Sequence, residues 1–143
     1  MASLNLPNPK MMDVAVPSNM KIGLAQQEIA RRGWALDAKN AIAMVGRPDI
    51  AFVDLRETSE RAKHGSIPGA LHAPYGDLQK NIGPGGMLRE VARASDRRIV
   101  FYCAFGERSA MAVQAAQDAG IVSALHVEGG LDAWRKADGP LAR

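Results

Sequence analysis

Three short runs of apolar residues constrain the fold of this chain most. They are IAFVDL (50–55), RIVFYC (98–103) and SALHVEG (123–129), with a weaker candidate in ALHAPY (70–75). Runs of this kind are typical of strands buried on both faces, as in parallel sheets covered by helices. Helical stretches are expected between them, over 57–63, 86–94, 109–119 and 130–137. The alternation predicts a doubly wound α/β domain, with a mainly parallel sheet of about five short strands and helices on both faces.

The N-terminal part of the chain does not follow this alternation. Residues 1–19 contain three prolines and show no periodicity, which predicts an extended N-terminal arm. Over 20–33, apolar residues recur at helical spacing, so we expect an additional helix there. WAL (34–36) is expected to form a very short strand. Residues 34–143 then make up the α/β domain.

Composition excludes several classes of protein. The chain has 143 residues, which suits one domain, and a single cysteine, which rules out an internal disulfide and a structural zinc site. These features predict a reducing, cytoplasmic environment. No segment has the length or apolarity of a signal peptide or membrane span. A net charge of +3 from interspersed residues favours small anions over nucleic acid. We expect no metal and no organic cofactor.

The cysteine stands at the end of a predicted strand. Cys103 closes the run 98–103, and in an open parallel sheet ligands bind beyond the carboxyl ends of the strands. Gly106 gives the following turn its conformational freedom, and Arg108 adds a positive charge. Ser109 is expected to cap the helix over 109–119.

A turn this tight directs successive backbone N–H groups inward, and the helix N-terminus adds more of them. The residues expected to offer these groups to an anion are Ala104, Phe105, Gly106, Glu107, Arg108 and Ser109. Cysteines at helix N-termini or beside arginine ionise readily. We therefore predict that Cys103 is a nucleophilic thiolate rather than a buried apolar residue.

Four motifs, in order along the chain, resemble a known family. CAFGERS (103–109) is similar to the active-site loop of single-domain rhodaneses, which begins with the catalytic cysteine. VDLRE (53–57), GSIPGALHAP (65–74) and VEGGLDAW (127–134) resemble other signatures of that family. The resemblance covers about residues 34–140 and implies a rhodanese-like fold.

The resemblance also implies a reaction, in which Cys103 attacks the outer sulfur of a small anionic donor such as thiosulfate. The resulting persulfide passes its sulfur to a thiol, to cyanide or to a protein acceptor. The backbone N–H groups of the loop would stabilise the charged persulfide, and the Arg108 side chain would help to hold the donor.

Two alternatives remain open. Cdc25-type phosphatases share this fold by resemblance, but their loop has five residues between cysteine and arginine, whereas four separate Cys103 from Arg108 here. Glu107 could serve as the general acid that dephosphorylation needs, although its charge would repel a phosphate dianion. The second alternative is a non-catalytic binding domain on the rhodanese scaffold, which the intact cysteine loop disfavours.

Other polar residues are interpreted as structural. Asp54 and Arg56 end the first long strand near the loop, and we expect them to form a structural ion pair. His72 and His126 are expected to be satisfied within the fold. The family usually has histidine directly before IPGA, whereas this chain has Ser66 there and His64 two residues earlier.

The helix over 20–33 has one apolar face, which packs either on its own domain or on another subunit. The second arrangement would make the protein a homodimer.

Overall fold

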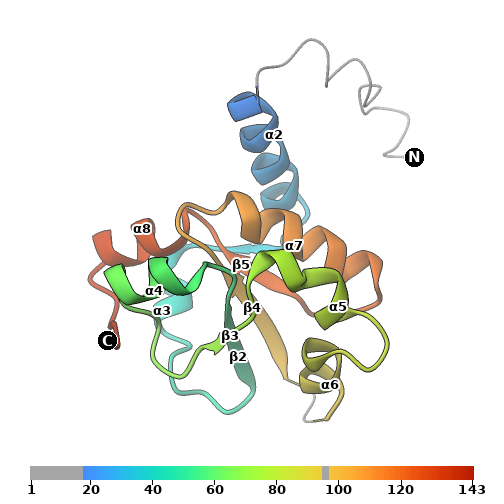
Figure 1. Cartoon of the computed structure of the whole chain (residues 1–143). Coiled ribbons are helices and arrows are strands. Elements are labelled where there is room, and N and C mark those ends of the chain that lie inside the picture. Colours follow the sequence, from blue (N-terminus) through green and yellow to red (C-terminus); the bar gives the residue numbers. More distant parts are fainter. Residues whose placement is uncertain (1–17, 95–96) are drawn as a thin grey trace.

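A five-stranded sheet forms the centre of the computed structural model, which describes residues 18–94 and 97–143 (Figure 1). The strands are β1 (Ala35–Leu36), β2 (Ile50–Asp54), β3 (Leu71–His72), β4 (Arg98–Tyr102) and β5 (Leu125–Val127). Their order across the sheet is β1-β5-β4-β2-β3, and every pairing is parallel. The predicted parallel α/β fold is confirmed.

The neighbouring inner strands β2 and β4 are buried, apart from Arg98, and their side chains alternate between two apolar cores. Val53 and Phe101 point into one core, and Phe52 and Val100 point into the other. This two-sided burial explains why both runs are nearly continuous in apolar residues.

Helices cover both faces of the sheet, as predicted. They are α2 (Ser18–Arg31), α3 (Ala38–Ile42), α4 (Thr58–His64), α5 (Leu78–Ile82), α6 (Met87–Ala94), α7 (Glu107–Asp118) and α8 (Gly130–Lys136), with a 3₁₀ turn at Tyr75–Asp77. Side chains of α2, α5, α6 and α7 enter one core, and those of α3 and α8 enter the other. No helix of the described residues is long and apolar enough to span a membrane.

Some boundaries differ from those expected. Helix α7 begins at Glu107 instead of Ser109, because Gly106 has a φ of 101° and occupies the N-cap position. Helix α2 covers Ser18–Arg31 instead of 20–33, so two residues assigned to the arm are helical. The rest of the predicted arm, 1–17, lies outside the described residues. The short helical turns over 75–82 were not predicted.

Helix α2 packs on its own domain against α7 (Figure 1). Ile29 is buried in the core, and Arg32 donates a hydrogen bond to Gln114 Oε1 at 3.2 Å. A Cβ atom at Gly106 would lie 2.8 Å from Gln26 Oε1. The additional helix therefore borders the cysteine loop.

Candidate active site

The candidate site lies where the chain changes direction across the sheet. From β2 the chain continues to the outer strand β3, whereas from β4 it continues the opposite way to β5. The crevice beyond the carboxyl ends of two such strands is the usual ligand site in open α/β sheets. Asp54 ends β2 and Cys103 directly follows β4, so the fold brings these two segments together.

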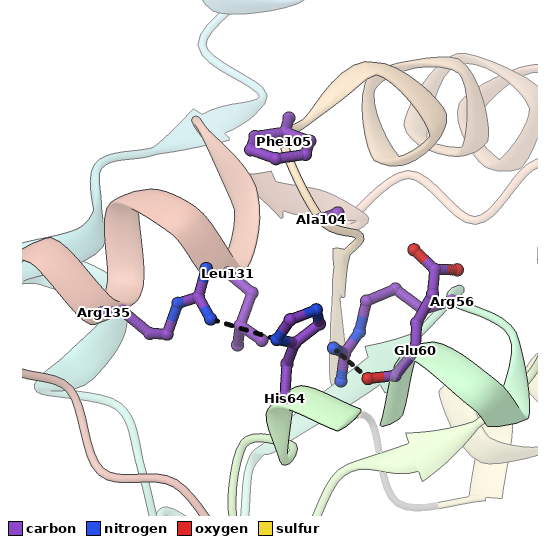
Figure 2. A pocket seen from close by; sticks show the side chains of 7 residues that line it. All are labelled: Arg56, Glu60, His64, Ala104, Phe105, Leu131 and Arg135. Atoms are coloured by element: carbon purple, nitrogen blue, oxygen red, sulfur yellow. Dashed lines mark hydrogen bonds between the residues drawn. The ribbon is translucent and has the colours of Figure 1, made fainter. Parts of the chain in front are cut away.

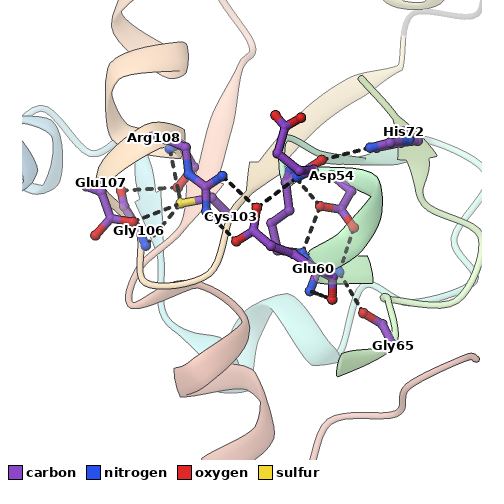
Figure 3. Close-up of polar contacts among 11 residues, drawn as sticks. Asp54, Glu60, Gly65, His72, Cys103, Gly106, Glu107 and Arg108 are labelled. Atoms are coloured by element: carbon purple, nitrogen blue, oxygen red, sulfur yellow. Dashed lines mark hydrogen bonds and ion pairs between the residues drawn. The ribbon is translucent and has the colours of Figure 1, made fainter. Parts of the chain in front are cut away.

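The cysteine loop wraps its own backbone around the sulfur. The N–H groups of Gly106 (Figure 3) and of Ser109 point at Cys103 Sγ, with N to S distances of 3.2 and 3.4 Å. Both groups belong to the N-terminal end of α7, where backbone donors have no helical partner. Negative charge on the sulfur is therefore stabilised by two hydrogen bonds and by the helix dipole.

The first turn of α8 holds the outer side of this loop. The N–H groups of Leu131 and Asp132 donate to the carbonyls of Cys103 and Ala104, at 2.9 and 3.0 Å. A Cβ atom at Gly130 would lie only 2.6 Å from Cys103 O, so only glycine permits this approach. Gly130 in the VEGGLDAW segment thus allows the first turn of α8 to donate hydrogen bonds to the carbonyls of the cysteine loop, while the N–H groups of that loop face the sulfur.

Ser109 is not the helix cap that the sequence predicted. It lies within the first turn of α7, fully buried, and its Oγ is 2.8 Å from His126 Nδ1 and 3.7 Å from Cys103 Sγ. The hydroxyl can also donate to Gly106 O at 3.2 Å. The sequence showed no sign of the His126 contact, since the two residues come from different elements.

Glu107 contributes its side chain as well as its backbone. Its Oε1 lies 3.7 Å from Cys103 Sγ, within reach of a hydrogen bond from the thiol. This carboxylate can accept a proton from the thiol, but it opposes negative charge on the sulfur once the proton has left.

The Arg108 side chain is held by a partner that the sequence did not reveal. Its guanidinium makes two hydrogen bonds of 2.9 Å to Glu60, which lies on α4 (Figure 3). These bonds lower the pKa of Glu60 to about 2. They are also the main cause that raises the pKa of Arg108, to which Cys103 adds a smaller contribution. Arg108 thus lies near the sulfur, but the hydrogen bonds of its guanidinium are made to Glu60 and are not free for a bound anion.

Asp54 and Arg56 form a buried ion pair beside the loop. Arg56 is 1% exposed and donates to both Asp54 oxygens, at 3.0 and 2.8 Å. It also donates to Gly65 O at 2.6 Å, while the Tyr102 hydroxyl donates to Asp54 at 2.8 Å. Burial and the nearby carboxylate raise the pKa of Tyr102, which keeps this hydroxyl protonated. Through Tyr102 and Gly65, the pair links β2 to β4 and to the end of α4.

A pocket opens in front of the loop (Figure 2). It has a volume of about 130 Å³ and is lined by Arg56, Glu60, His64, Ala104, Phe105, Leu131 and Arg135. This volume is small compared with drug-sized sites, so the pocket suits a small anion or the tip of a larger molecule. Phe105 is 58% exposed at its rim.

Two further polar side chains on this pocket were not predicted as site residues. Arg135 on α8 donates to His64 Nδ1 on α4, at 3.4 Å (Figure 2). Ser66, which stands where the family usually has histidine, instead pairs through its backbone with Ala142. His64 therefore lies on the pocket wall while Ser66 joins the C-terminal segment.

Cys103 itself is 0% exposed and does not line the pocket. A reactant can reach its sulfur only when the loop or the side chains above it move aside. The other predicted histidine, His72, bonds to Arg56 O at 2.7 Å, away from the sulfur. Among residues 18–94 and 97–143, no cluster of three or more metal-binding side chains occurs.

Several known proteins are similar to this chain. A mouse protein named thiosulfate sulfurtransferase/rhodanese-like domain-containing protein 3 is 32% identical over 97 residues, which cover 64% of this chain and 62% of the mouse protein. Human thiosulfate:glutathione sulfurtransferase is 27% identical over 110 residues, which cover 64% of this chain and 96% of the human protein. The chain also matches 28% of a tRNA uridine(34) hydroxylase from Pectobacterium carotovorum, at 32% identity over 71% of its own length.

Solved structures agree with the fold. A protein from Rhodopseudomonas palustris, described as a possible tyrosine phosphatase, has a TM-score of 0.75 and 36% identity, covering 85% of this chain and 93% of that one. A human single-domain sulfurtransferase has a TM-score of 0.60 and 22% identity, covering 72% and 96%. The sequence model of the Rhodanese-like domain matches residues 37–137, and the chain belongs to this family.

Proposed function

We propose that this protein is a sulfurtransferase that carries a sulfane sulfur as a persulfide on Cys103. The observation that supports this most is the position of Sγ, between the N–H groups of Gly106 and Ser109 at the start of α7. This arrangement favours a sulfur anion without any metal or organic cofactor. Relatives named as sulfurtransferases add independent support.

In the first half-reaction, the Cys103 thiolate attacks the outer sulfur of a small anionic donor such as thiosulfate. A new S–S bond forms, the bond between the two donor sulfurs breaks, and sulfite leaves with the electron pair. Glu107 is the carboxylate placed to take the proton from the resting thiol. The outer persulfide sulfur then carries the negative charge.

In the second half-reaction, an acceptor attacks the outer sulfur and the Cys103 thiolate leaves. A thiol, cyanide or a protein acceptor meets this requirement. The two backbone N–H groups stabilise Sγ again as charge returns to it. Both half-reactions thus depend on the same donors.

The pocket of about 130 Å³ is proposed as the path of the donor. Arg135 and His64 are the groups that would contact its anionic end, because Arg56 and Arg108 are already bound to Asp54 and Glu60. Exposed Phe105 and buried Leu131 form an apolar side against which a sulfur atom can lie.

A phosphatase is the second candidate, favoured by the similarity to the Rhodopseudomonas palustris protein. Two contacts argue against it. The Arg108 guanidinium is engaged by Glu60, and the Glu107 carboxylate lies 3.7 Å from the sulfur, where a phosphate dianion would be repelled.

Intact-mass spectrometry tests the proposal directly. Reduced protein is incubated with thiosulfate, and then with cyanide, alongside a Cys103→Ser control. Because the chain has one cysteine, we expect a gain of one sulfur atom that cyanide removes and that the control lacks.

No gain, with thiosulfate or with an organic persulfide as donor, would overturn the proposal. Hydrolysis of an aryl phosphate by the wild type but not by the Cys103→Ser variant would then support the phosphatase. Failure of both reactions would favour the non-catalytic binding domain.

A further inference from the structure

A buried histidine is connected to the cysteine through Ser109. His126 lies on β5, is fully buried, and has its Nδ1 atom 2.8 Å from Ser109 Oγ. Ser109 Oγ lies 3.7 Å from Cys103 Sγ, a distance within reach of an O–H to sulfur hydrogen bond. One residue directly after β4, one in α7 and one in β5 therefore form one chain of contacts.

The surroundings of His126 determine where its proton lies. Burial lowers the pKa of His126 to about 4, so the ring is neutral and carries one N–H. Its Nε2 atom is buried and has no hydrogen-bond partner among the described residues. A buried N–H without an acceptor is rarer in proteins than a lone pair without a donor. The proton therefore belongs on Nδ1, where it donates to Ser109 Oγ.

This assignment fixes the role of the serine hydroxyl. Since Ser109 Oγ accepts from His126, its own proton is free to be donated elsewhere. Two acceptors are within reach, Gly106 O at 3.2 Å and Cys103 Sγ at 3.7 Å. A charged acceptor forms the stronger hydrogen bond, so ionisation of the sulfur draws the hydroxyl toward it.

We infer that His126 is a positioning residue that keeps Ser109 as a hydrogen-bond donor to Cys103 Sγ. Ser109 then supplies a third donor to the sulfur, beside the N–H groups of Gly106 and Ser109 itself. The inference deepens the proposed sulfur transfer and rests on it. The third donor acts when Sγ is the attacking atom and again when it is the leaving atom.

Alkylation of Cys103 by iodoacetamide at neutral pH measures this role without any sulfur donor. Its rate depends on the fraction of thiolate as well as on access to the buried sulfur, and it can be measured whether or not the protein transfers sulfur. We expect Ser109→Ala and His126→Leu each to lower the rate by about 2- to 10-fold, as for the loss of one hydrogen bond.

Two variants separate positioning from packing. His126→Asn places an amide N–H near the position of Nδ1 and is expected to restore most of the rate. Combining His126→Leu with Ser109→Ala should lower the rate no further than Ser109→Ala alone, because His126 acts only through the serine. His72→Leu, a histidine lost from the edge strand β3, is the matched control and should leave the rate unchanged.

The inference is overturned if folded His126→Leu is alkylated at the wild-type rate. It is also overturned if His126→Leu slows the Ser109→Ala variant by the same factor as the wild type. Should His126→Leu not fold, His126→Asn is compared with His126→Gln, whose amide cannot occupy the Nδ1 position. Equal rates for these two variants would then reject the role of Nδ1. Loss of persulfide formation with normal alkylation would instead count against the proposed function alone.

Discussion

Two arginines at the same edge of the sheet make similar contacts in different surroundings. Arg56 binds both oxygens of Asp54 with both side chains almost completely buried, at 1% and 0% exposure. Arg108 binds both oxygens of Glu60, but these side chains are 26% and 30% exposed. The first pair joins segments of the fold, whereas the second lies near the Cys103 sulfur.

The difference in burial separates structural from functional effects. When one partner of a buried pair is removed, the other charge remains buried without compensation, which costs about 3–5 kcal/mol. An exposed pair contributes about 0–1 kcal/mol, because water solvates either charge alone. The Arg56–Asp54 pair therefore stabilises the fold, whereas the Arg108–Glu60 pair mainly affects the electrostatic potential at the Cys103 sulfur.

The largest effect is expected for Arg56→Met. This change leaves the buried Asp54 with only its neutral donors and Arg61, whose Nε lies 3.2 Å from Oδ2. We expect the free energy of unfolding to fall by about 3–5 kcal/mol, as measured by urea denaturation. Arg108→Met is the matched control, with an expected loss of at most about 1 kcal/mol. Equal losses for the two variants would remove the distinction between the pairs.

Arg108→Met should instead affect the chemistry of the sulfur. It removes a positive charge near Cys103 and leaves Glu60 without its partner. We expect alkylation of Cys103 by iodoacetamide to slow by about fivefold, the equivalent of roughly 1 kcal/mol. The double variant that adds Glu60→Gln should recover part of the rate, since it removes the unpaired carboxylate. No change in rate for Arg108→Met would show that Glu60 already cancels its charge at the sulfur.

Arg135 extends the comparison to an arginine that has no carboxylate partner among the described residues. It contacts His64 on the pocket wall, and its charge is available to an anion. We expect Arg135→Met to raise the KM for thiosulfate about threefold, as for one weakened charge contact at an exposed site. Stability and the rate of alkylation should not change. A fall in kcat at constant KM would place Arg135 in the chemical step instead of donor binding.

The sequence predicted those parts of the candidate site that are contiguous in the chain. The loop 103–109 was predicted because a strand, a glycine turn and a helix follow one another in CAFGERS. The partners that complete the loop were missed. These partners are Glu60, His126 and the first turn of α8, which lie far from the loop in sequence and contact it only in the folded sheet. No local sequence pattern indicates them.

The error at Ser109 has a local cause. Serine is a good N-cap residue, but the left-handed Gly106 starts the helix earlier and carries Ser109 into its first turn.

The catalytic role of Cys103, the donor and acceptor, the cytoplasmic location and the homodimer stay predictions, because they depend on reactions and partners.

Acid titration offers the finest test of the exposed pair. Hydrogen bonds from Arg108 lower the pKa of Glu60 from its usual 4.5 to about 2. A lowered pKa in the folded state means that the pair stabilises the protein above about pH 4.5. This contribution is lost as the pH falls through about 2. Because the pair is partly exposed, the contribution at neutral pH is at most about 1 kcal/mol.

Glu60→Gln should therefore be less stable than the wild type at neutral pH by that small amount, and the gap should close between pH 4.5 and 2. Urea denaturation of both proteins across this range measures the gap, and other carboxylates cancel in the difference. Glu90→Gln is the matched control, since Glu90 lies 3.9 Å from Arg93 on exposed side chains of α6. A gap that stays constant with pH would show that the carboxylate of Glu60 acts through packing, and that its charge is not what holds Arg108.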